Sequence, residues 1–264
     1  MHVSYYTDPA CPWSWAAEPA LRRLQAEFGA ALHITYIMGG LAREFSRPLE
    51  TMRHVLDAAE ASGMPVDPRL WLDHPPRSSY PACQAVKAAA EQGLDGPYLR
   101  VVREGLMARR QKLDTADTLV GAARGVAGLD VERFAVDLQS SAIVEAFGAD
   151  LALARAAALD GEPRVAFPSF VFRGEDGAEH WARDETSPAV VRAAALAAGA
   201  SPAVGGLPGA DEALRRFTTL ATPEVAAACD LPGPRAPAEL WRLAAEFRAR
   251  PERLLTGELW SAAV

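Results

Sequence analysis

Residues 6–15 read Tyr6-Thr7-Asp8-Pro9-Ala10-Cys11-Pro12-Trp13-Ser14-Trp15. The short β-prone segment 2–7 leads into this stretch, and the Asp-Pro pair ends the strand. Apolar side chains at helical spacing follow over 13–28, and Gly29 is expected to stop that helix. Cys11 is therefore predicted to lie where a strand ends and a helix begins. Pro12 suits an early helical position, where no N–H has to be donated.

A cysteine in this place is a candidate nucleophile. The free amides and the dipole at a helix N-terminus favour a thiolate over a thiol. Such a location can lower a cysteine pKa well below its usual value of roughly 8.5, and the thiolate is the species that attacks disulfides. The alternative is a small buried cysteine used for packing. The strand–turn–Cys–Pro–helix arrangement favours the reactive thiol.

The rest of the chain predicts an α/β fold with a helical insertion. Segment 32–38 is a second strand, so the chain opens β-α-β with a right-handed crossover. Strand character returns at 165–173 and, after a hairpin turn, at 178–182, and Pro188 starts a helix to about Ala198. Six helices are expected between these parts, over 52–62, 81–92, 97–110, 115–125, 130–139 and 141–159.

Composition suggests three units. Residues 1–42 and 160–200 would form the α/β domain, and 43–159 the helical insertion. A Gly- and Pro-rich linker at 200–209 leads into a C-terminal extension, 205–264. Helices at 222–229 and 237–247 and a strand-like end at 253–260 fit either a winged-helix unit or a helical appendage packed on the main domain.

Net charge, hydrophobic pattern and cysteine and histidine content argue against several classes of protein. The net charge of −7 comes without a basic stripe, so no nucleic acid is expected as a partner. The chain shows no signal peptide and no long apolar run, which predicts a cytoplasmic protein that does not enter membranes. Three cysteines are too few for a disulfide framework and are expected to be thiols. The five histidines lack metal-ligand spacing, so no metal site is expected.

Three stretches together resemble the DsbA-like branch of the thioredoxin superfamily. They are residues 6–15, the segment Ser79-Tyr80-Pro81-Ala82-Cys83-Gln84-Ala85-Val86-Lys87-Ala88-Ala89, and Phe167-Pro168-Ser169-Phe170-Val171. The likeness is closest to the cytosolic dithiol–disulfide isomerase-like group, which includes an adaptor that delivers a transcription factor to a bacterial protease. Kappa-class glutathione transferases and 2-hydroxychromene-2-carboxylate isomerases are more distant. The resemblance implies a thioredoxin-like fold (β-α-β … β-β-α) with a large all-helical insertion and a small helical C-terminal extension.

The resemblance also implies a site around Cys11. Pro168 matches the cis-proline that faces the active-site cysteine in the family. Phe167, just before it, would offer backbone groups to a bound peptide or thiol. Pro12 and Trp13 would complete the substrate-binding surface.

One residue departs from the family pattern. Cys-x-x-Cys is replaced by Cys-Pro-Trp-Ser, so Ser14 stands where the resolving thiol would be, and an ordinary dithiol cycle through positions 11 and 14 is excluded. Chemistry through one thiol remains, in which Cys11 forms a mixed disulfide with glutathione or mycothiol as a loosely bound cosubstrate. Ser14 is expected to hydrogen-bond to the Cys11 thiolate and to lower its pKa. Alternatively, Ser14 or Cys11 orients a bound thiol cofactor.

The other two cysteines and the nearby acidic residues are predicted to have mainly structural roles. Cys83 is either a resolving thiol or, with more weight, a small buried residue of the insertion. Cys229 is expected to be structural. Asp8 and Glu18 are predicted to be helix caps or solvated charges.

Three functions follow from these residues. The first is a thiol–disulfide oxidoreductase acting through Cys11 on a small thiol or a protein disulfide. The second is a non-catalytic adaptor on a thioredoxin fold, and the third is a glutathione-type transferase or isomerase. Relatives are often dimers, so a homodimer is also considered.

Overall fold

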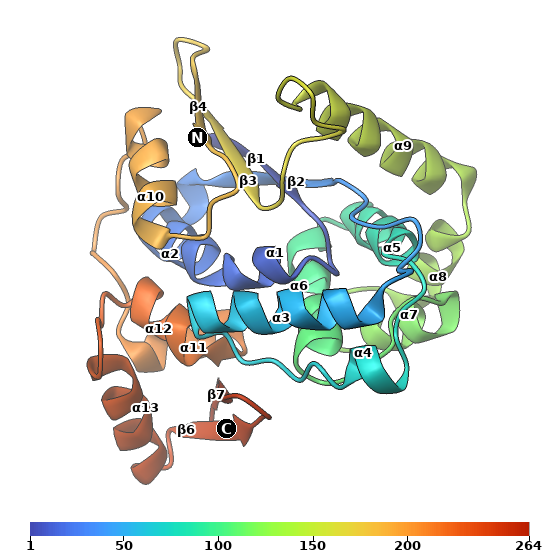
Figure 1. Cartoon of the computed structure of the whole chain (residues 1–264). Coiled ribbons are helices and arrows are strands. Elements are labelled where there is room, and N and C mark those ends of the chain that lie inside the picture. Colours follow the sequence, from blue (N-terminus) through green and yellow to red (C-terminus); the bar gives the residue numbers. More distant parts are fainter. Residues whose placement is uncertain (264) are drawn as a thin grey trace.

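A four-stranded sheet lies at the centre of the molecule, of which the computed structural model describes residues 1–263 (Figure 1). Its strands are ordered β2-β1-β3-β4, with β1 parallel to β2 and antiparallel to β3. The bounds are β1 His2–Thr7, β2 His33–Met38, β3 Ser169–Arg173 and β4 Glu179–Ala182. All four strands were expected from the sequence, as was the β-α-β … β-β-α order.

The first helix differs from its prediction. Instead of one helix over 13–28 there are two, α1 (Pro12–Ala16) and α2 (Glu18–Phe28). The break falls where Pro19 has no N–H to donate to the carbonyl of Trp15. Gly29 ends α2 with a positive φ of 55°, as expected, and leads into a 3-10 turn, η1 (Gly29–Ala31). Helix α10 (Pro188–Ala197) packs on α2, β3 and β4.

The insertion is entirely helical in the described residues. Its helices are α3 Pro48–Ser62, α4 Leu70–Asp73, α5 Tyr80–Ala90, α6 Asp95–Met107, α7 Ala116–Ala123, α8 Val131–Leu138 and α9 Ser141–Ala156. Six of them match the expected segments. The seventh, α4, is a single turn and too short to show a periodic pattern.

The C-terminal extension contains a second sheet, of three strands, where the sequence predicted helices and one strand-like end. Its elements are α11 Ala210–Phe217, β5 Leu220–Ala221, α12 Thr222–Ala228, α13 Arg235–Ala245, β6 Ala249–Arg253 and β7 Glu258–Ala262. The expected single strand at 253–260 instead covers the end of β6, the turn, and the first three residues of β7. Helix–strand–helix–helix–strand–strand is the element order of winged-helix units. Helix α12 packs along α2 and joins this unit to the rest (Figure 1).

The two faces of the central sheet carry different apolar clusters. Val3 and Tyr5 of β1 point to the main core, which also holds Trp15. Tyr6 points to the opposite face because side chains alternate along a strand. There it joins a smaller cluster that contains Cys11. None of the helices in residues 1–263 has the length and apolar character that a membrane crossing requires.

Candidate functional site

Cys11 lies directly before α1, at its N-cap position. Only 3% of its surface is exposed, and its Sγ lies 3.7 Å from the carbonyl oxygen of Phe167, to which it donates a hydrogen bond. The Phe167–Pro168 peptide bond is cis, as expected. Ser14 lies one helical turn after Cys11 and is fully buried. The structure thus brings four of the predicted site residues together from segments far apart in the chain.

The pKa of Cys11 departs from the expectation. Burial raises it above its ordinary value, while hydrogen bonds from the Ser14 side chain and amide lower it. The sequence predicted a lowered pKa from the helix N-terminus. Because α1 has only five residues, its dipole is small, and the loss of water around the sulfur outweighs it. The lowering effect of Ser14 itself is as expected.

A pocket of about 350 Å³ opens beside Cys11. Its lining comes from α1, the β2–α3 connection, α3 and the segment before β3: Cys11, Pro12, Trp13, Leu41, Phe45, Thr51, His54, Arg164, Ala166 and Phe167. Four of the six residues predicted to form the site therefore line this pocket. Ser14 and Pro168 are buried and do not line it.

Arg164 is a pocket residue that the sequence analysis missed. Its guanidinium lies 4.8 Å from the centre of the Phe167 ring, and its Nη2 donates to the carbonyl of Leu41 at 3.3 Å. Within residues 1–263, its buried Nε has no hydrogen-bond partner. Arg164 therefore brings a positive charge to the pocket. No local pattern marks it, since it lies in an irregular segment more than 150 residues from Cys11.

Gly39 allows the Phe167 ring to cover this site. A Cβ on Gly39 would lie 1.8 Å from the ring of Phe167. The ring therefore occupies space that only a glycine leaves free at the end of β2.

Asp8 is buried, which corrects the expectation of a solvated charge. Its carboxylate accepts hydrogen bonds from the amides of Ala10 and Leu41, at 2.8 and 2.5 Å. It also accepts from Ser79 Oγ at 2.9 Å and from Cys83 Sγ at 3.2 Å. Asp8 thus ties the end of β1 to the segment after β2 and to the start of α5.

Cys83 is completely buried in the main core, whereas Cys11 belongs to the smaller cluster. Burial and the neighbouring Asp8 raise the pKa of Cys83 well above its ordinary value. Both thiols are free. These surroundings fit a packing residue better than a resolving thiol.

A cluster of buried ion pairs lies behind the site, and the sequence did not reveal it. Glu18 was expected to be a cap or a solvated charge, but it accepts from Arg103 Nη1 at 2.5 Å and from Arg100 Nη1 at 3.0 Å. Three arginines and three glutamates take part: Arg22, Arg100, Arg103, Glu18, Glu104 and Glu224. Arg103 also donates to Thr7 Oγ1, which donates to Ser14 Oγ at 2.9 Å. The cluster therefore extends to the residue beside Cys11.

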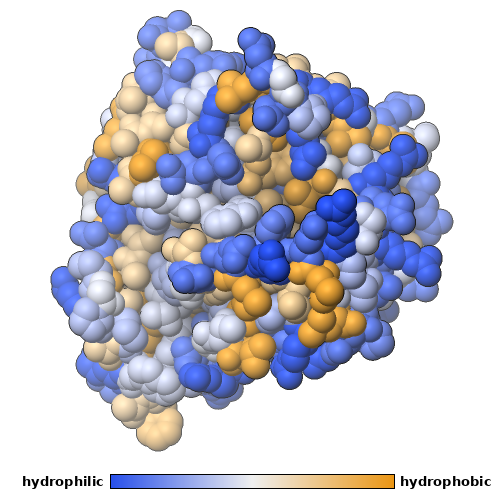
Figure 2. All heavy atoms as spheres, viewed as in Figure 1, coloured by the Kyte–Doolittle hydropathy of each residue, from blue (hydrophilic) through white to orange (hydrophobic). Residues whose placement is uncertain are grey.

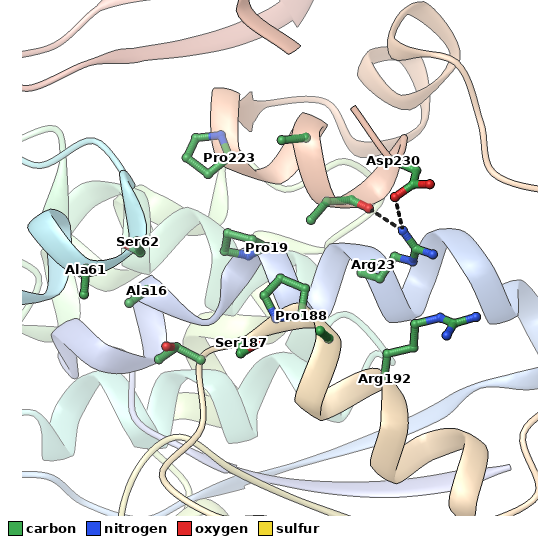
Figure 3. Close-up of a pocket in the computed structure, with 14 residues that line it drawn as sticks. Ala16, Pro19, Arg23, Ala61, Ser62, Ser187, Pro188, Arg192, Pro223 and Asp230 are labelled. Atoms are coloured by element: carbon green, nitrogen blue, oxygen red, sulfur yellow. Dashed lines mark hydrogen bonds and ion pairs between the residues drawn. The ribbon is translucent and has the colours of Figure 1, made fainter. Parts of the chain in front are cut away.

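A larger cavity, of about 580 Å³, lies between α2, α10 and α12 (Figure 3). Its charged side chains are already paired. Arg23 contacts Glu27 at 2.8 Å and Asp230 at 3.4 Å, and Arg192 contacts Glu27 at 2.6 Å. The remaining walls are mainly alanine and proline. The smaller pocket, which holds the nucleophile, is thus the better candidate. No group of three His, Cys, Asp or Glu side chains able to hold a metal ion occurs in residues 1–263.

The sheet order is β2-β1-β3-β4, and a helical insertion separates β2 from β3. A cysteine lies before the first helix and faces a cis-proline at the start of β3. These features together define a thioredoxin-fold protein of the DsbA-like kind. A family model described as thioredoxin matches residues 5–180, which are 176 of the 264 residues. The chain belongs to this family.

Curated relatives are similar to just under two thirds of the chain. The ClpXP adapter protein SpxH of Halalkalibacterium halodurans is 33% identical over 184 residues, covering 65% of this chain and 58% of the relative. The protein of the same name from Bacillus subtilis is 27% identical, covering 63% and 58%. The chain thus matches less than two thirds of the length of these relatives.

Solved structures share the fold. A putative protein disulfide isomerase from Nitrosomonas europaea has a TM-score of 0.63 at 18% identity, covering 74% of this chain and 96% of that one. The cytosolic disulfide reductase DsbM from Pseudomonas aeruginosa has a TM-score of 0.60 at 21% identity, covering 73% and 96%. DsbM has also been solved with GSH.

Proposed function

We propose that this chain is a thiol–disulfide oxidoreductase that works through Cys11 alone, with a small thiol as cosubstrate. The observation that carries the proposal is the placement of Cys11 between the N-terminus of α1 and the Phe167 carbonyl, at a pocket of about 350 Å³. Ser14 cannot resolve a mixed disulfide, and Cys83 is buried in the other cluster. The second thiol must therefore come from solution, and we place the protein in the cytoplasm, where such thiols are abundant.

The exchange proceeds in two balanced steps. The Cys11 thiolate attacks one sulfur of a disulfide, a new S–S bond forms to Cys11, and the other half leaves as a thiolate. A second small thiolate then attacks the mixed disulfide and regenerates the Cys11 thiolate. One such round releases one half of the substrate as a thiolate and leaves the other half in a mixed disulfide with the small thiol. In a second round Cys11 attacks the small-thiol sulfur of that mixed disulfide and the remaining half leaves as a thiolate. Over the two rounds one substrate disulfide is reduced while two small thiols become one small disulfide. The backbone carbonyl of Phe167 and the ring of Trp13 would border the bound sulfur.

Arg164 suggests which small thiols suit the pocket. A guanidinium at the wall of a pocket is a partner for a carboxylate. Glutathione carries two carboxylates, and DsbM, whose fold is shared, has been solved with it, so glutathione is the first thiol to test. Mycothiol, which has no carboxylate, would gain nothing from this arginine.

The first test is incubation with oxidised glutathione, followed by intact-mass and peptide analysis. We expect one glutathione per chain, attached to Cys11, in the wild-type protein and in Cys83→Ala, and none in Cys11→Ser. An adduct that persists in Cys11→Ser contradicts the proposal. Turnover with reduced glutathione should survive in Cys83→Ala, and its loss there would make Cys83 the resolving thiol.

The role of Arg164 is tested with a pair of disulfides. Arg164→Gln should slow exchange with oxidised glutathione about tenfold, the usual effect of losing a charge-assisted hydrogen bond. Exchange with the uncharged bis(2-hydroxyethyl) disulfide should stay within about twofold, since it offers no carboxylate. Equal slowing with both disulfides would mean that Arg164 supports the fold of the site rather than recognising the cosubstrate.

An adaptor function is the second candidate, because an apolar surface flanks the pocket. Apolar side chains gather over α3 and α4 on the face shown in Figure 2. Leu49, Leu56 and Leu72 are exposed there, and Thr51 and His54 of the same helix α3 line the Cys11 pocket. The relatives named as ClpXP adapters also favour this function.

The adaptor candidate is tested with purified ClpXP. Binding should persist in Cys11→Ala, whereas Leu49→Ser and Leu72→Ser should weaken it and leave glutathione exchange intact. If ClpXP does not bind, or if its binding needs Cys11, this candidate fails.

A further inference from the structure

We propose that Arg103 and Thr7 are positioning residues that turn the Ser14 hydroxyl into a one-way hydrogen-bond donor to Cys11. Arg103 of α6 donates to Thr7 of β1, and Thr7 donates to Ser14 of α1, which lies one helical turn after the cysteine. This inference rests on the proposed function only in taking Cys11 as the reacting thiol. It explains how a cysteine so deeply buried can still react.

The direction of each hydrogen bond follows from what its groups can donate. A guanidinium has donors only, so Thr7 Oγ1 must accept from Arg103. The single hydroxyl hydrogen of Thr7 then points to Ser14 Oγ, 2.9 Å away. Ser14 Oγ accepts that hydrogen, and its own hydrogen is left for Cys11. The hydrogen bond from the Ser14 side chain lowers the pKa of Cys11, in line with this direction.

Arg103 is held firmly enough to orient the chain. Its side chain has no exposed surface, and its Nη1 is fixed on Glu18 at 2.5 Å. Burial alone would raise the pKa of Glu18. Arg22 and Arg103 nevertheless hold this pKa well below its ordinary value, so Glu18 remains charged. Arg103 therefore stays positive and its second amino group, Nη2, stays directed at Thr7.

Other charged groups face Cys11 from different sides. Asp8, from the turn before it, raises its pKa, and Arg103, from α6, lowers it. His54 of α3 and Arg164 line the pocket on the solvent side. The hydrogen-bond chain reaches the sulfur from the protein interior, so solvent does not compete for these donors.

The test is a double-mutant cycle on Thr7 and Ser14. Iodoacetamide alkylation of the Cys11 peptide is followed by mass spectrometry at several pH values in Thr7→Val, Ser14→Ala, the double variant and the control Thr7→Ser. At pH 7 we expect about tenfold slower alkylation in Ser14→Ala and about threefold in Thr7→Val, with the pH profile displaced to higher pH in both. Thr7→Ser keeps the hydroxyl and should match the wild-type protein.

The decisive measurement is the alkylation rate of Cys11 in the double variant. If Thr7 acts through Ser14, adding Thr7→Val to Ser14→Ala slows alkylation no further. The proposal would be overturned if the two single substitutions slowed alkylation by factors that multiply in the double variant. It would also be overturned if Cys11 were alkylated as slowly in Thr7→Ser as in Thr7→Val. Should Thr7→Val not fold, an unchanged pH profile in Ser14→Ala would overturn it as well. Alkylation needs no biological thiol, so its outcome is separate from that of the glutathione experiment.

Discussion

Two opposing effects meet at the sulfur of Cys11. Burial favours the neutral thiol, whereas Ser14 favours the thiolate. A pKa that is raised in the folded protein means that folding stabilises the thiol form relative to the unfolded chain. This contribution to stability is complete below the unfolded pKa of about 8.5 and is lost as the pH rises through the folded pKa.

The stability advantage of the wild-type protein over Cys11→Ala should therefore shrink as the pH rises above about 8.5. Urea unfolding of both proteins at pH 7 and pH 9.5 measures this difference in the free energy of unfolding. The titration of all other groups is common to both proteins and therefore cancels when the two free energies are subtracted. An advantage that grows with pH would show that the hydrogen bonds to the thiolate outweigh burial.

At the scale of elements, the site depends on how closely three segments approach one another. The end of β2 lies against the Phe167 ring at Gly39, and the carbonyl of Phe167 in turn contacts Cys11 before α1. Asp8 holds the same region to the start of α5. A change in any of these segments is therefore transmitted to the thiol.

Gly39→Ala should displace the Phe167 ring, because the new Cβ would lie 1.8 Å from it. We expect a loss of about 1–3 kcal/mol in the free energy of unfolding, as for other overpacked sites. Cys11 should also be alkylated faster as its cover is lost. The control is Gly148→Ala in α9, which meets no atom within 4 Å and should gain up to about 1 kcal/mol. If the two variants had the same free energy of unfolding and the same rate of Cys11 alkylation, Gly39 would not be required for the position of the Phe167 ring.

At the scale of the whole molecule, buried ion pairs join the C-terminal extension to the thioredoxin domain. Glu224 of α12 is fully buried and contacts Arg100 of α6 at 2.5 Å and Arg22 of α2 at 3.1 Å. Glu224 compensates the buried charges of Arg22 and Arg100, so its removal leaves buried positive charge without a partner. The extension is thus held on the same cluster that supports Arg103.

Glu224→Gln should lower the free energy of unfolding by about 3–5 kcal/mol and speed proteolysis in the linker at 200–209. Asp230→Asn is the matched control, since its carboxylate is 76% exposed and contacts Arg23 at 3.4 Å. That variant should lose at most about 1 kcal/mol. If both variants are equally stable, the cluster does not hold the extension in place.

The cis-proline at 168 was implied by the family resemblance. By itself, the sequence determined the order of the strands and of most helices in residues 1–200, and the position of Cys11 before the first helix. These features depend on short-range patterns, such as alternation, helical spacing and the placement of proline and glycine. It also showed directly that Ser14 replaces a second cysteine.

Only the tertiary structure decided the surroundings of the thiol. Phe167 covers Cys11 from 156 positions away, and Arg103 reaches Thr7 across 96 positions. Burial and long-range hydrogen bonds arise from packing between distant segments, which no local pattern encodes. For the same reason the raised pKa of Cys11 could not be predicted, because desolvation depends on everything that surrounds the sulfur rather than on its place in the helix.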